Sequence, residues 1–377
     1  MYTLVVTMQF KALTLAAVAA TASAQTMNLT ATLQNQTSLS NLTTYLNAFP
    51  QLVSQLSRQQ NVTLLAPSNE AFTKLQNQPG GFPVSDPGLI TALFSYHVLH
   101  GRFPKFSALP RAIPSELMPG AYANVTGGQR VVSSSNATGS TFYSGLDLKS
   151  TAASGAINFT GGVIHIIDTF LTIPQNISTT AADLGLSAFA DAATQAGLVS
   201  SLDSAHDITI FVPNNAAFAA IGSTFQNASN STISSVLEYH VISGVYYSHA
   251  ATNTTVRTLN GANITVTVTN ETVFINSARV IVPNIPIANG VAHVIDEVLN
   301  PANATATPSP TATSGTSSVS GTPSTSGIPA PSSSVATSNA SAASSSSSSS
   351  GGAAAPMITG AVGAAALFGG AAVMMNM

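Results

Sequence analysis

The sequence predicts an α+β fold made of two tandem copies of one domain. Three blocks occur twice in the same order: 61–72 and 207–218, 96–98 and 239–241, and 162–168 and 290–296. In each copy a helical periodicity comes first and strand-like alternation follows. We therefore predict one domain over 27–173 and a second over 174–300, each long enough for a core of its own.

Each copy is expected to open with an amphipathic helical face. A short apolar strand follows, at 63–66 in the first copy and at 208–212 in the second, and Pro67 or Pro213 ends it. Ser68 or Asn214 can then cap the next helical turn. The residues at helical spacing are Leu39, Leu42, Leu46, Phe49, Val53 and Leu56, and then Leu184, Leu186, Phe189, Ala193, Ala196 and Leu198.

A further helix in each copy has clear boundary signals. In the first copy, Asp86 can cap it, Pro87 occupies its first position and Gly101 follows its end. In the second copy the cap is expected at Asn230 or Ser231. His97 and His240 lie on the apolar faces of these two helices.

The rest of each copy is predicted to form strands. Residues 263–269 alternate apolar and polar side chains, and Asn270 with Glu271 forms the turn into the next strand. Gly162 and Gly290 follow tight turns and begin the last strands. The first copy has extra length around 104–128, which we expect to be a loop or a strand extension.

Both ends of the chain are typical of processing and anchoring segments. Residues 1–24 resemble a secretory signal peptide cleaved before Gln25, with a buried terminal helix as the alternative. Residues 301–350 are rich in Ser, Thr and Pro and are expected to form a disordered, O-glycosylated stalk. Residues 351–377 fit a glycosylphosphatidylinositol (GPI) attachment signal that is removed, with a C-terminal transmembrane helix as the alternative. The attachment candidates are Ser348, Ser349, Ser350 and Gly351.

The composition points to a surface covered by sugar. Only 6% of the residues are charged, the chain has no Cys, and its net charge of −3 with no basic run excludes an electrostatic nucleic-acid site. Sequons for N-glycosylation are frequent. They begin at Asn28, Asn35, Asn41, Asn61, Asn124, Asn136, Asn158, Asn176, Asn227, Asn230, Asn253, Asn263, Asn270, Asn303 and Asn339.

The repeated blocks resemble those of the fasciclin (FAS1) domain family. The resemblance rests on an apolar strand running into Pro-x-Asn-x-Ala-Phe, a Tyr-His pair after a helix, and a closing Gly-x-x-His-x-Ile-Asp strand, and it covers nearly all of 27–300. It implies a twisted β-sandwich or wedge with flanking helices in each domain. The whole layout is similar to that of fungal GPI-anchored fasciclin-like surface proteins. The residues expected to define the fold are Pro67, Asn69, Phe72, His165, Asp168, Pro213, Asn215, Phe218, His293 and Asp296.

The Tyr-His pairs are the candidate adhesion motif that the resemblance implies: Tyr96, His97, Tyr239 and His240. Their position on apolar helix faces favours imidazoles that hydrogen-bond inward, with the neighbouring tyrosines more exposed. His165 and His293 alternate with buried residues and are expected to be structural, while Asp168 and Asp296 are expected to bond backbone N–H groups.

No motif in the sequence indicates a metal site, a cofactor or catalysis. We therefore expect a non-enzymatic adhesion protein whose partners are surface, wall or matrix glycoproteins or polysaccharides, including a second copy of itself. Contact with a membrane is expected only through the lipid anchor. The alternatives are a structural glycoprotein that organises the cell wall, and a module that binds wall polysaccharide or a small apolar ligand. The features that distinguish this protein are expected where the copies differ, at 101–131 and at Tyr246 and Tyr247.

Overall fold

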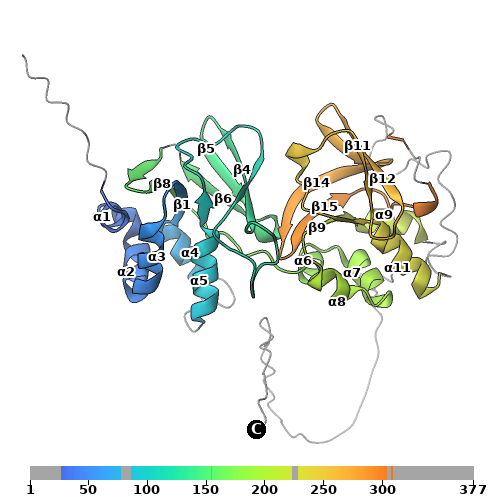
Figure 1. Ribbon diagram of the computed structural model, residues 1–377, viewed down its shortest axis with the longest axis horizontal. Coiled ribbons are helices and arrows are strands. Elements are labelled where there is room, and N and C mark those ends of the chain that lie inside the picture. The colour runs from blue at the N-terminus through green and yellow to red at the C-terminus, as the bar shows by residue number, and fades with distance from the viewer. Residues whose placement is uncertain (1–26, 78–85, 154, 223–227, 304–306, 309–377) are drawn as a thin grey trace, which may run out of the picture.

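The computed structural model describes residues 27–77, 86–153, 155–222, 228–303 and 307–308. It confirms the α+β prediction: two domains with the same order of elements lie side by side, and most helices cover one side of the sheets (Figure 1). The predicted signal peptide, the predicted GPI signal and nearly all of the predicted stalk lie outside the described residues. So do Asn227, Asn339 and the four attachment candidates from Ser348 to Gly351.

The first domain opens with more helices than expected. These are α1 (Leu29–Gln34), η1 (Thr37–Leu39), α2 (Ser40–Ala48) and α3 (Pro50–Arg58), before β1 (Val62–Pro67), α4 (Asn69–Gln76) and α5 (Pro87–Tyr96). The predicted helical face is split at Phe49, whose φ of −124° and ψ of 67° are not helical. The reason is Pro50, which has no N–H for a continuing helix but fits the first position of a new one.

The second domain repeats this order. It has α6 (Ile177–Asp183), α7 (Ser187–Gln195), α8 (Val199–Ser204), β9 (Ile208–Pro213), α9 (Asn215–Ala220) and α11 (Asn230–Tyr239). The caps at Ser68, Asn214 and Asp86 are confirmed, since each side chain accepts a hydrogen bond from a backbone N–H of the first turn. The predicted cap of α11 is wrong by one or two residues: Ser229 caps it through the Thr232 N–H.

Each domain contains one mixed sheet. The first is ordered β2-β1-β8-β6-β5-β4-β3, with β7 also paired to β8. Its strands after β1 are β2 (Val98–His100), β3 (Arg111–Pro114), β4 (Arg130–Asn136), β5 (Gly139–Tyr143), β6 (Lys149–Ala153), β7 (Ile157–Phe159) and β8 (Gly162–Ile167). Only the β1–β8 pair is parallel among these described pairings. The extra length of the first copy lies in the long loop between β3 and β4.

The second sheet is ordered β10-β9-β15-β14-β13-β12-β11, with β9 and β15 parallel. Its strands after β9 are β10 (Val241–Ser243), β11 (Thr254–Arg257), β12 (Asn263–Thr269), β13 (Thr272–Ile275), β14 (Ala278–Ile287) and β15 (Gly290–Ile295). The predicted strand at 263–269 and its turn are confirmed. Asn270 and Glu271 both have positive φ, 50° and 64°, as a two-residue hairpin turn requires.

The central strand of each sheet separates two apolar cores. In β1, Leu64 packs with Phe72 and Phe94 under the helices, whereas Leu65 packs with Phe142 on the opposite face. In the second domain Ile210 and Phe211 divide between two cores in the same way. Because successive side chains alternate between the faces of a strand, β1 and β9 are buried at every position. The sheet bends around the second core, which gives each domain the wedge that the resemblance implies.

The parallel pairs tolerate no side chain at the first position of the last strand. A Cβ at Gly162 or Gly290 would collide with the carbonyl oxygen of Val62 or Ile208.

We expect Gly162→Ala and Gly290→Ala each to lower the free energy of unfolding by about 1–3 kcal/mol, measured by urea denaturation. Gly120→Ala is the control and should change it by less than about 0.5 kcal/mol, since a Cβ there meets only one atom within 4 Å. Equal effects at the three positions would contradict this account.

Candidate functional site

The Tyr-His pairs lie in the interior. Tyr96, His97, Tyr239 and His240 all have 0% of their surface exposed. The prediction that the tyrosines are more exposed than the histidines is wrong, because each ring fills the core on the far side of the sheet. Each phenol donates to a backbone carbonyl, that of Arg130 for Tyr96 (2.9 Å) and that of Asn263 for Tyr239 (2.8 Å). An adhesive role of this motif stays a prediction, and because all four side chains are buried it would have to be indirect, through support of the surface above them.

The imidazoles of His97 and His240 bridge two parts of the backbone. In His97, Nδ1 lies 2.7 Å from the Leu93 carbonyl oxygen, and the Leu171 N–H donates to Nε2 at 3.0 Å. His240 makes the same two contacts with Val236 and Leu299. Since a backbone N–H must donate, Nε2 is the acceptor, Nδ1 carries the proton and the ring is neutral. The predicted inward bonding is confirmed: each ring ties a helix end to the segment after the last strand.

The histidines of the last strands bond the loop that follows the edge strand of each sheet, β2 or β10. His165 Nε2 lies 2.8 Å from the Phe103 carbonyl oxygen, and His293 Nε2 lies 2.8 Å from that of Tyr246. A second group at this place was not expected from the sequence: the buried hydroxyl of Thr63 donates to the Gly101 carbonyl and accepts from the Phe103 N–H. Thr209 makes the equivalent bonds. The sequence does carry a signal for this group, because the second residue of the first strand is a threonine in both copies.

The remaining motif residues also bond or pack within the fold. Asn69 donates to the Thr37 carbonyl and accepts from the Asn41 N–H, which ties α4 to the first helices, and Asn215 does the same for the second domain. Pro67, Phe72, Pro213 and Phe218 are buried.

The aspartates that close the last strands bond backbone N–H groups, as predicted. Asp168 accepts from both the N–H and the hydroxyl of Thr151, and Asp296 accepts from the Arg279 N–H. Burial raises the pKa of Asp168, but the bonds from Thr151 and Thr169 and the charge of Lys74 together outweigh it, and the net pKa is lowered.

The two segments in which the copies differ meet at the joint between the domains, where the sheets approach each other (Figure 1). From the long loop of the first domain, the N–H of Asn124 donates to the Ala288 carbonyl at 2.6 Å and its side-chain amide donates to that of Ala205 at 3.2 Å. The backbone and hydroxyl of Thr126 donate to the two carboxylate oxygens of Asp207 at 2.7 and 2.6 Å. We call this contact region the joint, and it also includes Gln129 and Tyr247.

Further contacts at the joint are buried. Gln129 is fully buried and donates to the Ile287 carbonyl at 2.7 Å. Tyr247 packs with Ala112 and Val132 of the first domain and with Val291 of its own. A buried apolar cluster inside a set of hydrogen bonds holds the domains in one relative orientation.

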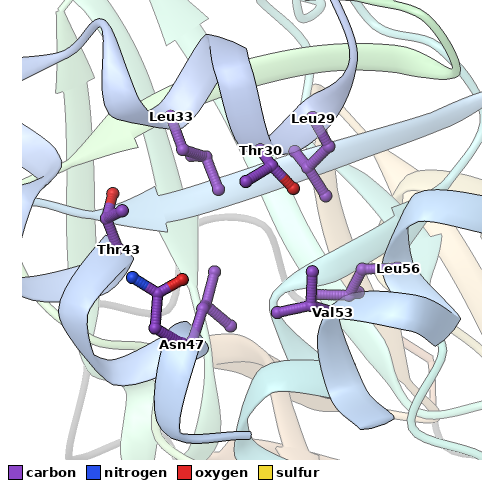
Figure 2. Close-up of a pocket in the computed structure, with 8 residues that line it drawn as sticks. Leu29, Thr30, Leu33, Thr43, Asn47, Val53 and Leu56 are labelled. Carbon is purple, nitrogen blue, oxygen red and sulfur yellow. The ribbon is translucent and has the colours of Figure 1, made fainter. Parts of the chain in front are cut away.

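A small apolar pocket lies among the first three helices of each domain. In the first domain Leu33 and Val53 point into the space between the helices (Figure 2), and the cavity is about 10 Å³. The equivalent cavity among α6, α7 and α8 is about 120 Å³. Ala193 of α7 takes the place of Leu46 of α2, which accounts for the larger space. Both are well below the several hundred Å³ of a typical ligand site.

Within the described ranges, no three His, Asp or Glu side chains gather as a metal site would require. No helix in the same ranges has the length and apolar character needed to cross a bilayer.

The family model described as the fasciclin domain matches residues 37–174 and 184–301. The chain belongs to the fasciclin family. It carries two tandem FAS1 domains, as the repeated blocks predicted.

Several known proteins are similar to this fasciclin chain. A fasciclin-like arabinogalactan protein of Arthroderma benhamiae is 35% identical over 72% of the chain and 66% of its own length, so the chain spans about two thirds of that relative. A second, from Phaeosphaeria nodorum, is 32% identical over 72% of the chain and 88% of its own length. The solved FAS1 domain pair from the insect cell adhesion molecule fasciclin I is 18% identical, and it covers 67% of this chain and 92% of its own. Its TM-score of 0.31 is too low to support a structural argument.

Buried neutral histidines should make the stability of this fasciclin protein depend on pH. Burial, partly offset by a hydrogen bond, lowers the pKa of His97, His240 and His293 to about 4. Between pH 6.5 and 4 the unfolded chain binds protons that the folded chain does not. The free energy of unfolding should therefore have its full value above pH 6.5. It should decrease as the pH falls toward 4, by on the order of 3 kcal/mol per ring.

Denaturation at pH 7.5, 5.5 and 4.5 tests this dependence. His97→Phe should lose about 2–4 kcal/mol at pH 7.5, because the Leu171 N–H and the Leu93 carbonyl lose their partner, and it should show a shallower pH slope. His100→Gln replaces a partly exposed histidine, which lies 3.0 Å from a Glu116 carboxylate oxygen, and should keep most of the wild-type slope. A stability that is flat from pH 7.5 to 4.5 would show that the rings are not buried as described.

The sequon at Asn124 should stay unmodified in the docked protein. The amide nitrogen that would carry the glycan donates to Ala205 of the other domain, so only chains without sugar at this position can form the joint. Mass spectrometry of glycopeptides should find Asn124 largely unoccupied and the exposed Asn136 of the same domain occupied. Full occupancy at Asn124 in folded protein would contradict the joint.

Proposed function

We propose that this fasciclin protein is a GPI-anchored extracellular glycoprotein that mediates adhesion between cells or between a cell and its matrix. The similarity to fasciclin-like arabinogalactan proteins supports the extracellular and glycosylated character. The low content of charged residues, 6%, supports it as well, because glycans would then keep the surface soluble.

The positions of the sequons fit a glycosylated surface. Most described sequon asparagines are exposed, while Asn124, Asn176 and Asn303 are partly buried. The exposed ones are Asn28, Asn35, Asn41, Asn61, Asn136, Asn158, Asn230, Asn253, Asn263 and Asn270. Glycans at these positions would leave the cores and the joint undisturbed.

The joint is the observation that carries the adhesive proposal. It makes two domains into one unit, so both present their surfaces in a constant relative orientation. Weak contacts made by the two domains and by many chains on one membrane add through effective concentration. The 50-residue stalk predicted at 301–350 would raise the pair by up to about 150 Å when extended.

Exposed apolar side chains offer the contact surface in place of the buried Tyr-His pairs. Leu109 is 73% exposed and Tyr246 is 53% exposed. Both belong to the segments in which the two copies differ.

The two alternatives have less support. The cavity of about 120 Å³ in the second domain is small for a ligand pocket, which weighs against a small-molecule binding module. A wall-organising glycoprotein would depend on its sugars rather than on Leu109 and Tyr246, so substitution of these two residues separates it from an adhesion protein.

The test is a strain that lacks the protein, complemented with wild type or variants and scored for attachment and wall integrity. Wild type should restore attachment, and phosphatidylinositol-specific phospholipase C should release the protein and reduce attachment. Leu109→Ser with Tyr246→Ser should lower attachment several-fold without loss of stability, because the two side chains are exposed. Thr30→Ser, at the first-domain pocket, is the control. Retention of the protein after phospholipase, or full attachment with the double variant, would contradict the proposal.

A further inference from the structure

The joint contains two arginines without an acidic partner. The chain has ten Lys and Arg residues, and two of them, Arg111 and Arg130, lie on the paired strands β3 and β4. Within the part of the chain that the structure describes, neither guanidinium has a hydrogen bond or an ion pair. A carboxylate of the joint, that of Asp207, is already bonded to Thr126 and His206. Neither cation therefore has a paired counter-charge among the residues that the structure describes.

Strand geometry directs Arg130 toward the second domain. Residues two apart on a strand lie on the same face, so Arg130 shares a face of β4 with Val132. Val132 packs against Tyr247 of the second domain. The Arg130 carbonyl accepts the Tyr96 hydroxyl at 2.9 Å, which anchors this point of the strand to the core.

Two buried donors at this place lack an acceptor. Among the described residues, Arg130 Nε and the hydroxyl of Tyr247 are buried and make no hydrogen bond. A buried polar group without a partner costs about 1–3 kcal/mol, and a charged one costs more. One donor comes from each domain, so a single acceptor between them would satisfy both.

The electrostatic surroundings are positive. Burial lowers the pKa of His249, and the charges of Arg111 and Arg130 lower it further. The His249 ring also lies 6.0 Å from that of Tyr247, between centroids. Arg111, Arg130, Tyr247 and His249 therefore form one cluster. The two arginine charges give this cluster a positive potential, which attracts an anion.

We propose that the joint binds an oxyanion, a carboxylate or a sulfate, between Arg130 of the first domain and Tyr247 of the second. Arg111 contributes the surrounding positive potential, and the neutral His249 ring lies beside Tyr247. Because the two direct donors belong to different domains, the bound anion stabilises the docked arrangement. An acidic saccharide or inorganic sulfate has the required chemistry. The site does not depend on whether the protein mediates adhesion.

The experiment is calorimetric titration of the full protein with sodium glucuronate and with sodium sulfate, against sodium chloride at equal ionic strength. Thermal unfolding in the same salts gives a second readout, since a ligand of the folded state raises the Tm. We expect saturable binding of at least one of the two oxyanions and none of chloride. Which of them binds identifies the group that the joint accepts.

Three variants make the result specific. Arg130→Met and Tyr247→Phe should each weaken binding about tenfold or more, as expected for loss of a charge-assisted hydrogen bond. Tyr247→Phe removes only an unsatisfied hydroxyl, so it should fold at least as stably as wild type in chloride. Arg58→Met removes an exposed charge far along the chain from the joint and should bind like wild type.

Absence of saturable binding by both oxyanions would overturn the proposal. So would equal losses in Arg58→Met and Arg130→Met, which would indicate a general charge effect. Sulfate stabilises folded proteins without binding, so a Tm rise that Tyr247→Phe and Arg130→Met share fully with wild type also counts against the site.

Discussion

Each domain depends on the parallel pairing of its first strand with its last, β1 with β8 and β9 with β15. These strands are buried on both faces, so they must be apolar throughout and must approach each other without interference. The three repeated blocks all surround this pair: one contains the first strand, one ends the helix behind it, and one forms the last strand. A requirement of packing therefore explains why these blocks are the parts that the two copies share.

The buried polar groups serve the same pairing. His97 and His240 join a helix end to the chain that leaves the last strand, and a neutral imidazole suits this task because it donates at one nitrogen and accepts at the other. Thr63 and His165 fix the connection that leaves the edge of the sheet. These histidines look like paired reactive groups in the sequence, but all their described bonds are to backbone within their own domain.

What is particular to this protein lies where the copies differ. The long loop of the first domain donates hydrogen bonds to carbonyl and carboxylate oxygens of the second domain. Tyr247 of the second domain packs against the first. Tandem domains joined in this way act as one body, which would suit the multivalent adhesion proposed above better than two freely rotating units. At the same joint Arg130 of the first domain and the Tyr247 hydroxyl of the second are buried donors without a hydrogen bond among the described residues, a combination that neither domain has alone.

The sequence by itself determined the duplication, the order of helices and strands, the caps at Ser68, Asn214 and Asp86, and the turn at Asn270 and Glu271. These features are local or periodic, so a short stretch of chain carries the whole signal. Only the tertiary structure decided that the tyrosines of the Tyr-His pairs are buried, because periodicity shows which face of a helix is apolar but not how deeply its last residue lies. The roles of Thr63 and Thr209, and the joint from Asn124 to Gln129, were likewise decided by contacts between residues far apart in the chain. Such contacts depend on how the finished domains pack, and no local pattern records them.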